Sequence, residues 1–262
     1  MIKNKSTVLA VDMGNTSVSI GLFQGTKLVR KSHILTHSFK PEELQKLSLI
    51  EMKPEAILIS SVVPERNAFL KYSLTHSSGD CPVYFIGKDL PVPVVNKAKF
   101  PEQVGVDRLV NALQAFDLFK TACIAVDFGT AITFDVVSKK GEYLGGVIAP
   151  GIELTLNALF EKTSLLPKIK LKHPHTVLGR STEECIRSGC SFGLGALCDG
   201  ILEQLAVESK TRYQIIATGG YARFMTRYSK AIRRIDEDLN LKGIHLVFLK
   251  SKASGSRSRL AL

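Results

Sequence analysis

Apolar runs separated by short polar turns characterise the first part of the chain. Residues 7–11, 17–23 and 27–35 are rich in β-branched and aliphatic side chains, which predicts three strands. The connections at 13–16 and 24–26 contain residue types that are typical of tight turns, including glycine, asparagine and threonine. The fold is therefore expected to start with antiparallel hairpins.

Helical and extended patterns alternate after these hairpins. Residues 41–52 and 65–73 are predicted helices, whereas the apolar runs in EAILISSVVP and PVYFIG have the length of short buried strands. Between 104 and 119, apolar residues recur at helical spacing: Val106, Leu109, Val110, Leu113 and Phe116. This spacing predicts a helix that begins near GVDR and buries one face. The alternation favours an α/β layered domain.

The stretch CIAVDFGTAITFDVV repeats the design of AVDMGNTSVSIGLFQG near the start of the chain. In both, an apolar strand ends in an aspartate, a turn with glycine follows, and a second apolar strand begins. Asp12 and Asp127 lie nearly half the chain apart, which is too long for a solenoid period and favours duplication of one domain. We expect domains over residues 1–119 and 120–250 that pack closely and share a cleft, with a basic tail over 251–262.

The second half continues with further strands and helices. YLGGVIAPGIEL predicts a strand, a glycine-rich bend and a helix start at Gly151. Residues 182–207 are mostly helical in pattern, and YQIIATGG is a strand that ends in a threonine and two glycines. DEDLNLKGIHLVFL predicts a terminal helix.

Composition narrows the class of protein. A hydrophobic content of 45% supports ordinary packed cores, and no uncharged apolar run is long enough to predict a membrane span. The start MIKNKSTVLAVDMG fits a first strand better than a secretory segment, so a cytoplasmic protein is expected. The 5 cysteines form no C-x-x-C pair and are expected to be reduced thiols. The net charge of +11 raises the question of nucleic acid, but it is dispersed along the chain and accompanies no nucleic-acid-binding motif.

The DMGNT turn has two readings. It can be an ordinary hairpin, or its exposed amides with Asn15 and Thr16 can bind phosphate oxygens, while Gly14 allows close approach or positive φ. Asp12 can then hold a hydrated magnesium ion, because that metal prefers oxygen ligands and retains several waters. Its recurrence at DFGT favours a nucleotide site, and TGG at 218–220 is a third candidate wall beside an adenosine.

Together these three elements resemble the phosphate and adenosine motifs of the acetate and sugar kinase, Hsp70 and actin superfamily. The resemblance implies an α/β fold with two duplicated actin-like (ribonuclease H-like) domains, each a mixed sheet flanked by helices, and a nucleotide cleft. Six blocks in order narrow it further: DMGNT, ISSVVP, GVDRLVNA, VDFGTAITF, GGVIAPGI and ATGG. In this order they resemble a type III pantothenate kinase, from Leu9 to about Gly243.

That resemblance implies ATP-dependent phosphorylation of pantothenate to 4'-phosphopantothenate, the first step of coenzyme A biosynthesis, in a homodimer whose subunits share each active site. Asp107 matches the general base, and its place at a helix start is expected to stabilise the anion and make it a modest base. Asp127 matches the ligand of a monovalent cation, K⁺ or NH₄⁺. The implied ATP contacts are Asp12, Met13, Gly14, Asn15, Thr16, Ser17, Val18, Ser19 and Thr130. The implied pantothenate contacts are Phe100, Gly105, Val106, Asp107, Arg108 and Thr182, the last from the other subunit.

Several of these assignments have plainer alternatives. Arg108 can pair with the pantothenate carboxylate or be a surface arginine, and Thr182 lies in STEE, which is also a good capping box. Family members commonly carry a tyrosine where this chain has Ala98, and Phe100 is the candidate replacement. A nucleotide-binding regulatory protein of the same fold that has lost catalysis is the alternative function, although the presence of Asp107 and Asp127 opposes it.

Overall fold

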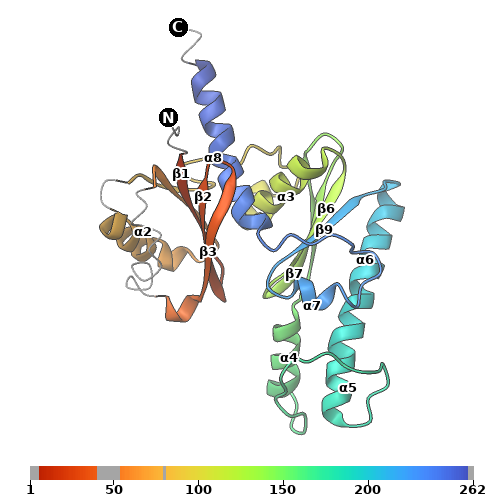
Figure 1. Cartoon of the computed structure of the whole chain (residues 1–262). Helices are drawn as coiled ribbons and strands as arrows, with labels where there is room; N and C mark the ends of the chain where they lie inside the picture. Colours follow the sequence, from red (N-terminus) through yellow and green to blue (C-terminus); the bar gives the residue numbers. More distant parts are fainter. Residues whose placement is uncertain (1–5, 40–53, 79–80, 259–262) are drawn as a thin grey trace. The chain divides into compact units, whose positions relative to one another are not determined.

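The computed structural model describes residues 6–39, 54–78 and 81–258, which form two compact units (Figure 1). The first unit comprises Met1–Val94, Phe100–Gln114 and Leu239–Leu262, and the second comprises Val95–Lys99 and Ala115–Asp238. This division differs from the expected one chiefly at the C-terminus, where the last helix is part of the first unit. The predicted helix at 41–52 lies outside the described residues.

The first unit is built on a mixed sheet in the order β3-β2-β1-β4-β5. Its strands are β1 (Thr7–Met13), β2 (Ser17–Gln24), β3 (Lys27–Leu35), β4 (Ala56–Ser61) and β5 (Val83–Phe85). The first three form the predicted antiparallel hairpins, and β4 pairs in parallel with both β1 and β5. A parallel neighbour requires a crossover connection, so the strands after the hairpins carry the α/β part of the fold.

Helices cover the first sheet because its central strand is apolar on both sides. They are α2 (Pro64–Ser78), α3 (Val106–Phe119) and α8 (Leu239–Ser258), and the short turns η1 (Thr36–Ser38) and η2 (Pro101–Gln103) belong to the connections. Successive strand residues point to opposite faces. Leu9 and Val11 therefore pack in one core with Leu70 of α2, whereas Val8 packs in a second core with Val110 of α3.

Helix α8 completes the second of these cores. Ile244 and Val247 are fully buried there, and His245 stacks on Phe23 of β2 with ring centroids 4.3 Å apart. The helix continues to Ser258, so the first residues of the expected basic tail are helical, while 259–262 lie outside the described residues. Packing against the first sheet explains why the C-terminal segment joins the N-terminal unit.

The second unit repeats the topology of the first. Its strands β6 (Cys123–Phe128), β7 (Ala131–Val137), β8 (Tyr143–Pro150) and β9 (Gln214–Thr218) follow the order β8-β7-β6-β9. As in the first unit, three antiparallel strands are joined by a parallel neighbour of the first of them. Asp12 pairs with Ser60 across the parallel ladder of one unit, and Asp127 pairs with Thr218 in the other. The predicted duplicated fold class is confirmed.

The helices of the second unit are α4 (Ile152–Glu161), α5 (Thr182–Ser188), a π-helical turn η3 (Gly189–Gly193), α6 (Leu194–Ser209) and α7 (Ala222–Met225). By length and composition alone, the continuous segment Thr182–Ser209 could cross a membrane. It also carries charged side chains near both ends, at 183–187 and 199–208, and its apolar residues Ile186, Leu194 and Leu202 are buried in the core of the second unit. The segment therefore fits a core helix of the α/β unit.

Candidate functional site

The first candidate phosphate turn connects β1 to β2. Its backbone closes where the Gly14 amide donates to the Ser17 carbonyl at 2.9 Å. A Cβ on Gly14 would lie 3.3 Å from that carbonyl oxygen, so glycine serves close approach here, and its φ is not positive. The Thr36 hydroxyl donates to the Gly14 carbonyl at 2.7 Å. Side-chain and backbone bonds thus hold the turn in one conformation.

The residues of this turn differ in what they can offer a nucleotide. Met13 and Val18 are fully buried in the first unit, so only their backbone atoms are available for binding. Asn15 and Thr16 are exposed at the tip, and Asp12 is half-buried at the strand end. The turn therefore presents backbone amides, two polar side chains and one carboxylate, which is the chemistry that phosphate with a hydrated metal ion requires.

The second candidate turn connects β6 to β7 in the other unit and is enclosed by glycines. Gly219 has φ +90°, and a Cβ there would lie 2.3 Å from Oδ1 of Asp127. A Cβ on Gly151 would lie 2.2 Å from the Thr130 carbonyl oxygen. Only glycine fits at either position, because any side chain would displace the turn or the carboxylate. The TGG and APG motifs thus pack directly on the DFGT turn.

Backbone hydrogen bonds fix this second turn on both sides. The Gly151 amide at the start of α4 donates to the Thr130 carbonyl at 3.1 Å, and the Tyr221 amide donates to the Phe128 carbonyl at 3.2 Å. The Tyr221 hydroxyl also bonds Glu153 in the first turn of α4. The Thr130 side chain remains exposed. The arrangement places one carboxylate and several carbonyl oxygens around a rigid turn.

Asp107 lies in the first turn of α3 in the first unit. A Cβ on Gly105, two residues before it, would lie 2.4 Å from Oδ1 of Asp107, so a side chain there would displace the carboxylate. Asn240 of α8 donates through Nδ2 to the Asp107 carbonyl at 3.4 Å. The carboxylate is therefore folded back over Gly105, at the point where the helix begins.

The pKa of Asp107 is raised above its ordinary value. Burial is the dominant cause, and it outweighs the opposing effects of hydrogen bonds from the Arg108 and Asp107 amides and of the positive charge of Arg108. From the sequence alone we expect the helix start to stabilise the carboxylate anion of Asp107 and so to lower its pKa. That expectation is wrong, because the net shift of the pKa is upward. A raised pKa makes the carboxylate a stronger base than the sequence suggested.

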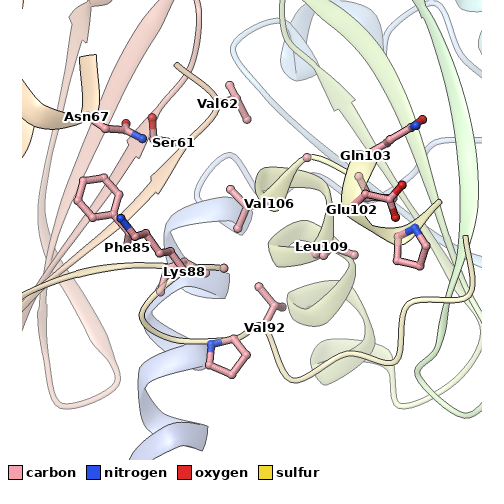
Figure 2. A pocket seen from close by; sticks show the side chains of 16 residues that line it. Ser61, Val62, Asn67, Phe85, Lys88, Val92, Glu102, Gln103, Val106 and Leu109 are labelled. Carbon is pink, nitrogen blue, oxygen red and sulfur yellow. The ribbon is translucent and has the colours of Figure 1, made fainter. Parts of the chain in front are cut away.

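A cavity of about 640 Å³ lies within the first unit, and Gly105 and Val106, which directly precede Asp107 in the chain, line part of it (Figure 2). Residues from three stretches of the chain line it, including Ser61, Val62, Asn67, Phe85, Lys88, Val92, Gln103, Gly105, Val106 and Leu109. Val62 also donates its amide to the Met13 carbonyl at 3.1 Å. One backbone segment therefore joins the cavity to the first phosphate turn.

The structure brings some predicted substrate contacts to this cavity and leaves others away from it. Gly105 and Val106 line it, whereas Asp107, Arg108 and Phe100 are not among its lining residues, and the Phe100 side chain is 50% exposed. Phe85 is the aromatic residue in the wall. The sequence reasoning missed Phe85 and Asn67, although PVYFIG and the helix after ISSVVP were the available signals.

Thr182 lies exposed at the start of α5 in the second unit. Half of the predicted capping box is present: the Ser181 side chain accepts from the Glu184 amide at 3.2 Å, whereas the Glu184 carboxylate accepts from the Arg180 amide at 2.7 Å instead of the Ser181 amide. The capping oxygen belongs to Ser181, so the Thr182 hydroxyl is not needed for that role.

Candidate metal ligands and cysteine thiols are further reactive groups in the described part of the chain. Within residues 6–39, 54–78 and 81–258, histidine, cysteine, aspartate and glutamate side chains do not gather in groups of three or more that could hold a metal ion. All five cysteines are free, and burial raises the pKa of Cys123 and of Cys198 to about 12. Those two thiols are therefore poor nucleophiles at neutral pH.

Comparison with known proteins agrees with this geometry. Residues 8–204 match the model of the family described as type III pantothenate kinase. The chain is 35% identical over 254 residues to a type III pantothenate kinase of Citrifermentans bemidjiense, covering 94% of this chain and all of that protein. It is 36% identical over 254 residues to one of Desulforapulum autotrophicum, covering 92% of this chain and 95% of that protein.

Solved structures show the same fold at lower sequence identity. A proposed Baf-family transcriptional activator from Campylobacter jejuni aligns with a TM-score of 0.58 and 17% identity over 94% of this chain and 99% of that one. A proposed N-acetylmannosamine kinase from Listeria monocytogenes aligns with a TM-score of 0.53 and 13% identity over the same shares. These likenesses support the sugar-kinase and actin-like fold alone.

Proposed function

Because this chain belongs to the type III pantothenate kinase family, and thus phosphorylates pantothenate with ATP in coenzyme A biosynthesis, we propose that Asp107 is the general base of that reaction. The observation that carries the assignment is the position of the carboxylate. It lies beside the cavity at the start of α3, and burial raises its pKa. Both features suit a group that accepts a proton from a hydroxyl.

The reaction needs the pantothenate hydroxyl to approach the γ-phosphorus of ATP while its proton leaves. Phosphoryl transfer has a loose transition state, so orientation of the hydroxyl matters more than early removal of the proton. In our proposal Asp107 orients the primary hydroxyl and accepts its proton as the new oxygen–phosphorus bond forms and the bond from the γ-phosphorus to the bridging oxygen breaks, with ADP as the leaving group. Gly105, Val106 and Arg108 bind the substrate beside it, with Arg108 pairing to the pantothenate carboxylate.

The two turns are the proposed ATP contacts. In the first, the backbone from Asp12 to Ser19 and the exposed side chains of Asn15 and Thr16 bind phosphate oxygens. In the second, Thr130 contacts the nucleotide. A kinase of this family uses a divalent metal with ATP, and Mg²⁺ is the ion proposed here, held through water by Asp12.

A monovalent cation, K⁺ or NH₄⁺, is proposed at Asp127. The residues present fit such an ion, since the carboxylate Oδ1 occupies the space left by the missing side chain of Gly219. Carbonyl oxygens of Phe128, Gly129 and Thr130 belong to the same turn. When bound, the ion supplies positive charge that offsets repulsion between phosphate oxygens.

A homodimer with shared active sites, in the cytoplasm, completes the proposal, with Thr182 as the contact from the partner. Large apolar side chains on α4 and before α5 support an interface in that region. They are exposed in the second unit: Leu154, Phe160, Leu165, Val177 and Leu178. Exposed apolar patches of this kind commonly mark protein interfaces.

The decisive test is ATP-dependent phosphorylation of pantothenate by the purified protein with and without K⁺. We expect turnover that depends on the cation. Asp127→Asn should weaken binding of the cation, because it removes the negative charge beside it. The K⁺ concentration needed for half-maximal rate should rise by about tenfold or more, which corresponds to a modest electrostatic change. Activity that is identical in K⁺ and in a large organic cation would overturn the cation assignment, and a complete lack of pantothenate phosphorylation would overturn the function.

The shared active site predicts complementation between two inactive variants. Thr182→Asp should fold, because an acid is favourable at a helix start, but it places negative charge against an anionic substrate. When Asp107→Asn and Thr182→Asp chains are unfolded and refolded together, half of the dimers are mixed and each contains one intact site. The mixture should regain about a quarter of wild-type activity. Activity no greater than that of the separate variants would argue against a shared site.

A further inference from the structure

The cavity beside Asp107 contains a buried acceptor that has no donor. Oδ1 of Asn67, in the first turn of α2, is buried and has no hydrogen-bond partner within the part of the chain that the structure describes. Asn67 also lines the cavity, where Figure 2 shows it on the side of Ser61 and Phe85, with Val106 and Leu109 presented by α3. A buried polar atom without a partner is costly, so an acceptor of this kind marks a place where a ligand donor fits.

The turn that carries Asn67 is held in place by its neighbours. Arg66 donates through Nη1 to the Thr36 carbonyl at 2.6 Å, and the Val63 amide donates to the Ser61 hydroxyl oxygen at 3.2 Å. Thr36 in turn bonds the Gly14 carbonyl of the first phosphate turn. The acceptor is therefore fixed relative to both the cavity and the phosphate turn before any ligand arrives, which favours specific binding.

Apolar side chains form a large part of the remaining wall of the cavity. Phe85, Val92, Val106 and Leu109 contribute aromatic and aliphatic surface, and each is half-buried. A ligand that fills the cavity thus needs an apolar body with a hydrogen-bond donor at one point along it.

We propose that Asn67 is a specificity-determining residue that accepts a hydrogen bond from the amide N–H of pantothenate. The proposal rests on the function proposed above, in which the primary hydroxyl of pantothenate lies at Asp107. The two methyl groups next to that hydroxyl suit the apolar wall. Beyond the primary hydroxyl, pantothenate has two donors, a secondary hydroxyl next to the dimethyl carbon and the amide N–H. The amide lies further from Asp107, so its N–H is the donor assigned to the Asn67 acceptor in this proposal.

The test combines a change in the protein with a change in the substrate. The substrate analogue is the ester in which oxygen replaces the amide N–H. Wild-type protein should phosphorylate this ester with a kcat/KM about 10- to 100-fold below that for pantothenate, because the Asn67 acceptor is left buried and unpaired. Asn67→Leu, which has similar size and no acceptor, should treat the amide and the ester alike, mainly through a raised KM for pantothenate.

Two further variants make the result specific. Asn67→Asp keeps an acceptor oxygen and should retain the preference for the amide, whatever its absolute rate. Gln204→Leu makes a comparable amide-to-aliphatic change on the exposed side of α6 and should leave the preference at the wild-type value. The KM for ATP should change little in any of them.

The opposite outcome is equally clear. If Asn67→Leu discriminates between amide and ester as strongly as the wild type, Asn67 does not accept a hydrogen bond from the amide N–H and the proposal is wrong. If the wild type accepts both substrates equally, it is also wrong. Failure of the proposed function is a separate observation, since the wild type would then phosphorylate neither compound.

Discussion

Asp107→Asn should abolish phosphorylation of pantothenate, lowering kcat/KM by about 10²- to 10⁴-fold, the range associated with loss of a general base. The amide has nearly the same shape as the carboxylate but cannot accept the proton of the hydroxyl. Asp117→Asn on the same helix is the matched control, because Asp117 is partly exposed and pairs with Lys120. Steady-state kinetics of both variants, with pantothenate binding measured by calorimetry, separate loss of chemistry from loss of affinity.

The pH dependence of kcat/KM should also reflect the role of Asp107 as a base. Since burial raises the pKa of Asp107, the acidic limb of the kcat/KM profile should lie above the ordinary pKa of an aspartate. The pKa of Asp107 is higher in the folded chain than in the unfolded chain, so between these two pKa values the folded chain binds one more proton. The free energy of unfolding therefore falls as pH rises through the folded pKa. Asp107→Asn should therefore be at least as stable as the wild type near neutral pH. A variant that is inactive and also markedly less stable would indicate a structural role instead.

Gly219→Ala should be the second most damaging change. A Cβ at this position would meet Oδ1 of Asp127 at 2.3 Å and the Phe128 carbonyl oxygen at 2.7 Å, and φ is +90°, which L side chains rarely adopt. Either the carboxylate or the TGG loop must move. We expect activity to fall by about 100-fold or more, because an ångström of misplacement can have that effect.

Gly220→Ala is its matched control. A Cβ on Gly220 has nothing within 4 Å, so this change should be tolerated. Kinetics as a function of K⁺ concentration and thermal unfolding of both variants would test the contrast. Equal activity of the two variants would mean that the space beside Asp127 is not important for function.

The strands were predictable because their sequence pattern is local. In β1 and β6 an apolar run ends in an aspartate, which is the last residue but one of each strand, and a glycine turn follows; the first turn is one residue longer than the second. Asp12 and Asp127 therefore fall at equivalent positions, as the repeated sequence design suggests. The resemblance also named Gly105 and Val106 as substrate contacts, and both line the cavity of the first unit.

The rest depended on long-range packing that local patterns do not encode. An apolar stripe on the last helix indicates that it is buried but not which sheet it covers, and Ile244 joins a core with Val8 at the other end of the chain. The cavity wall likewise combines Phe85 with Val106, and nothing in the spacing favours Phe85 over Phe100. The net pKa shift of Asp107 depends on the depth of burial, which the position at a helix start does not reveal.

The return of α8 to the first unit has a consequence for the order in which the protein can fold during synthesis. Most residues of the second unit are continuous in sequence, from Ala115 to Asp238, so they can pack as soon as they leave the ribosome. The first unit, although its strands are made before the second unit, lacks Leu239–Ser258 until the whole second unit has been made. One apolar face of its sheet, around Val8 and Phe23, therefore waits for the last helix, and the N-terminal half of this kinase is the half that matures last.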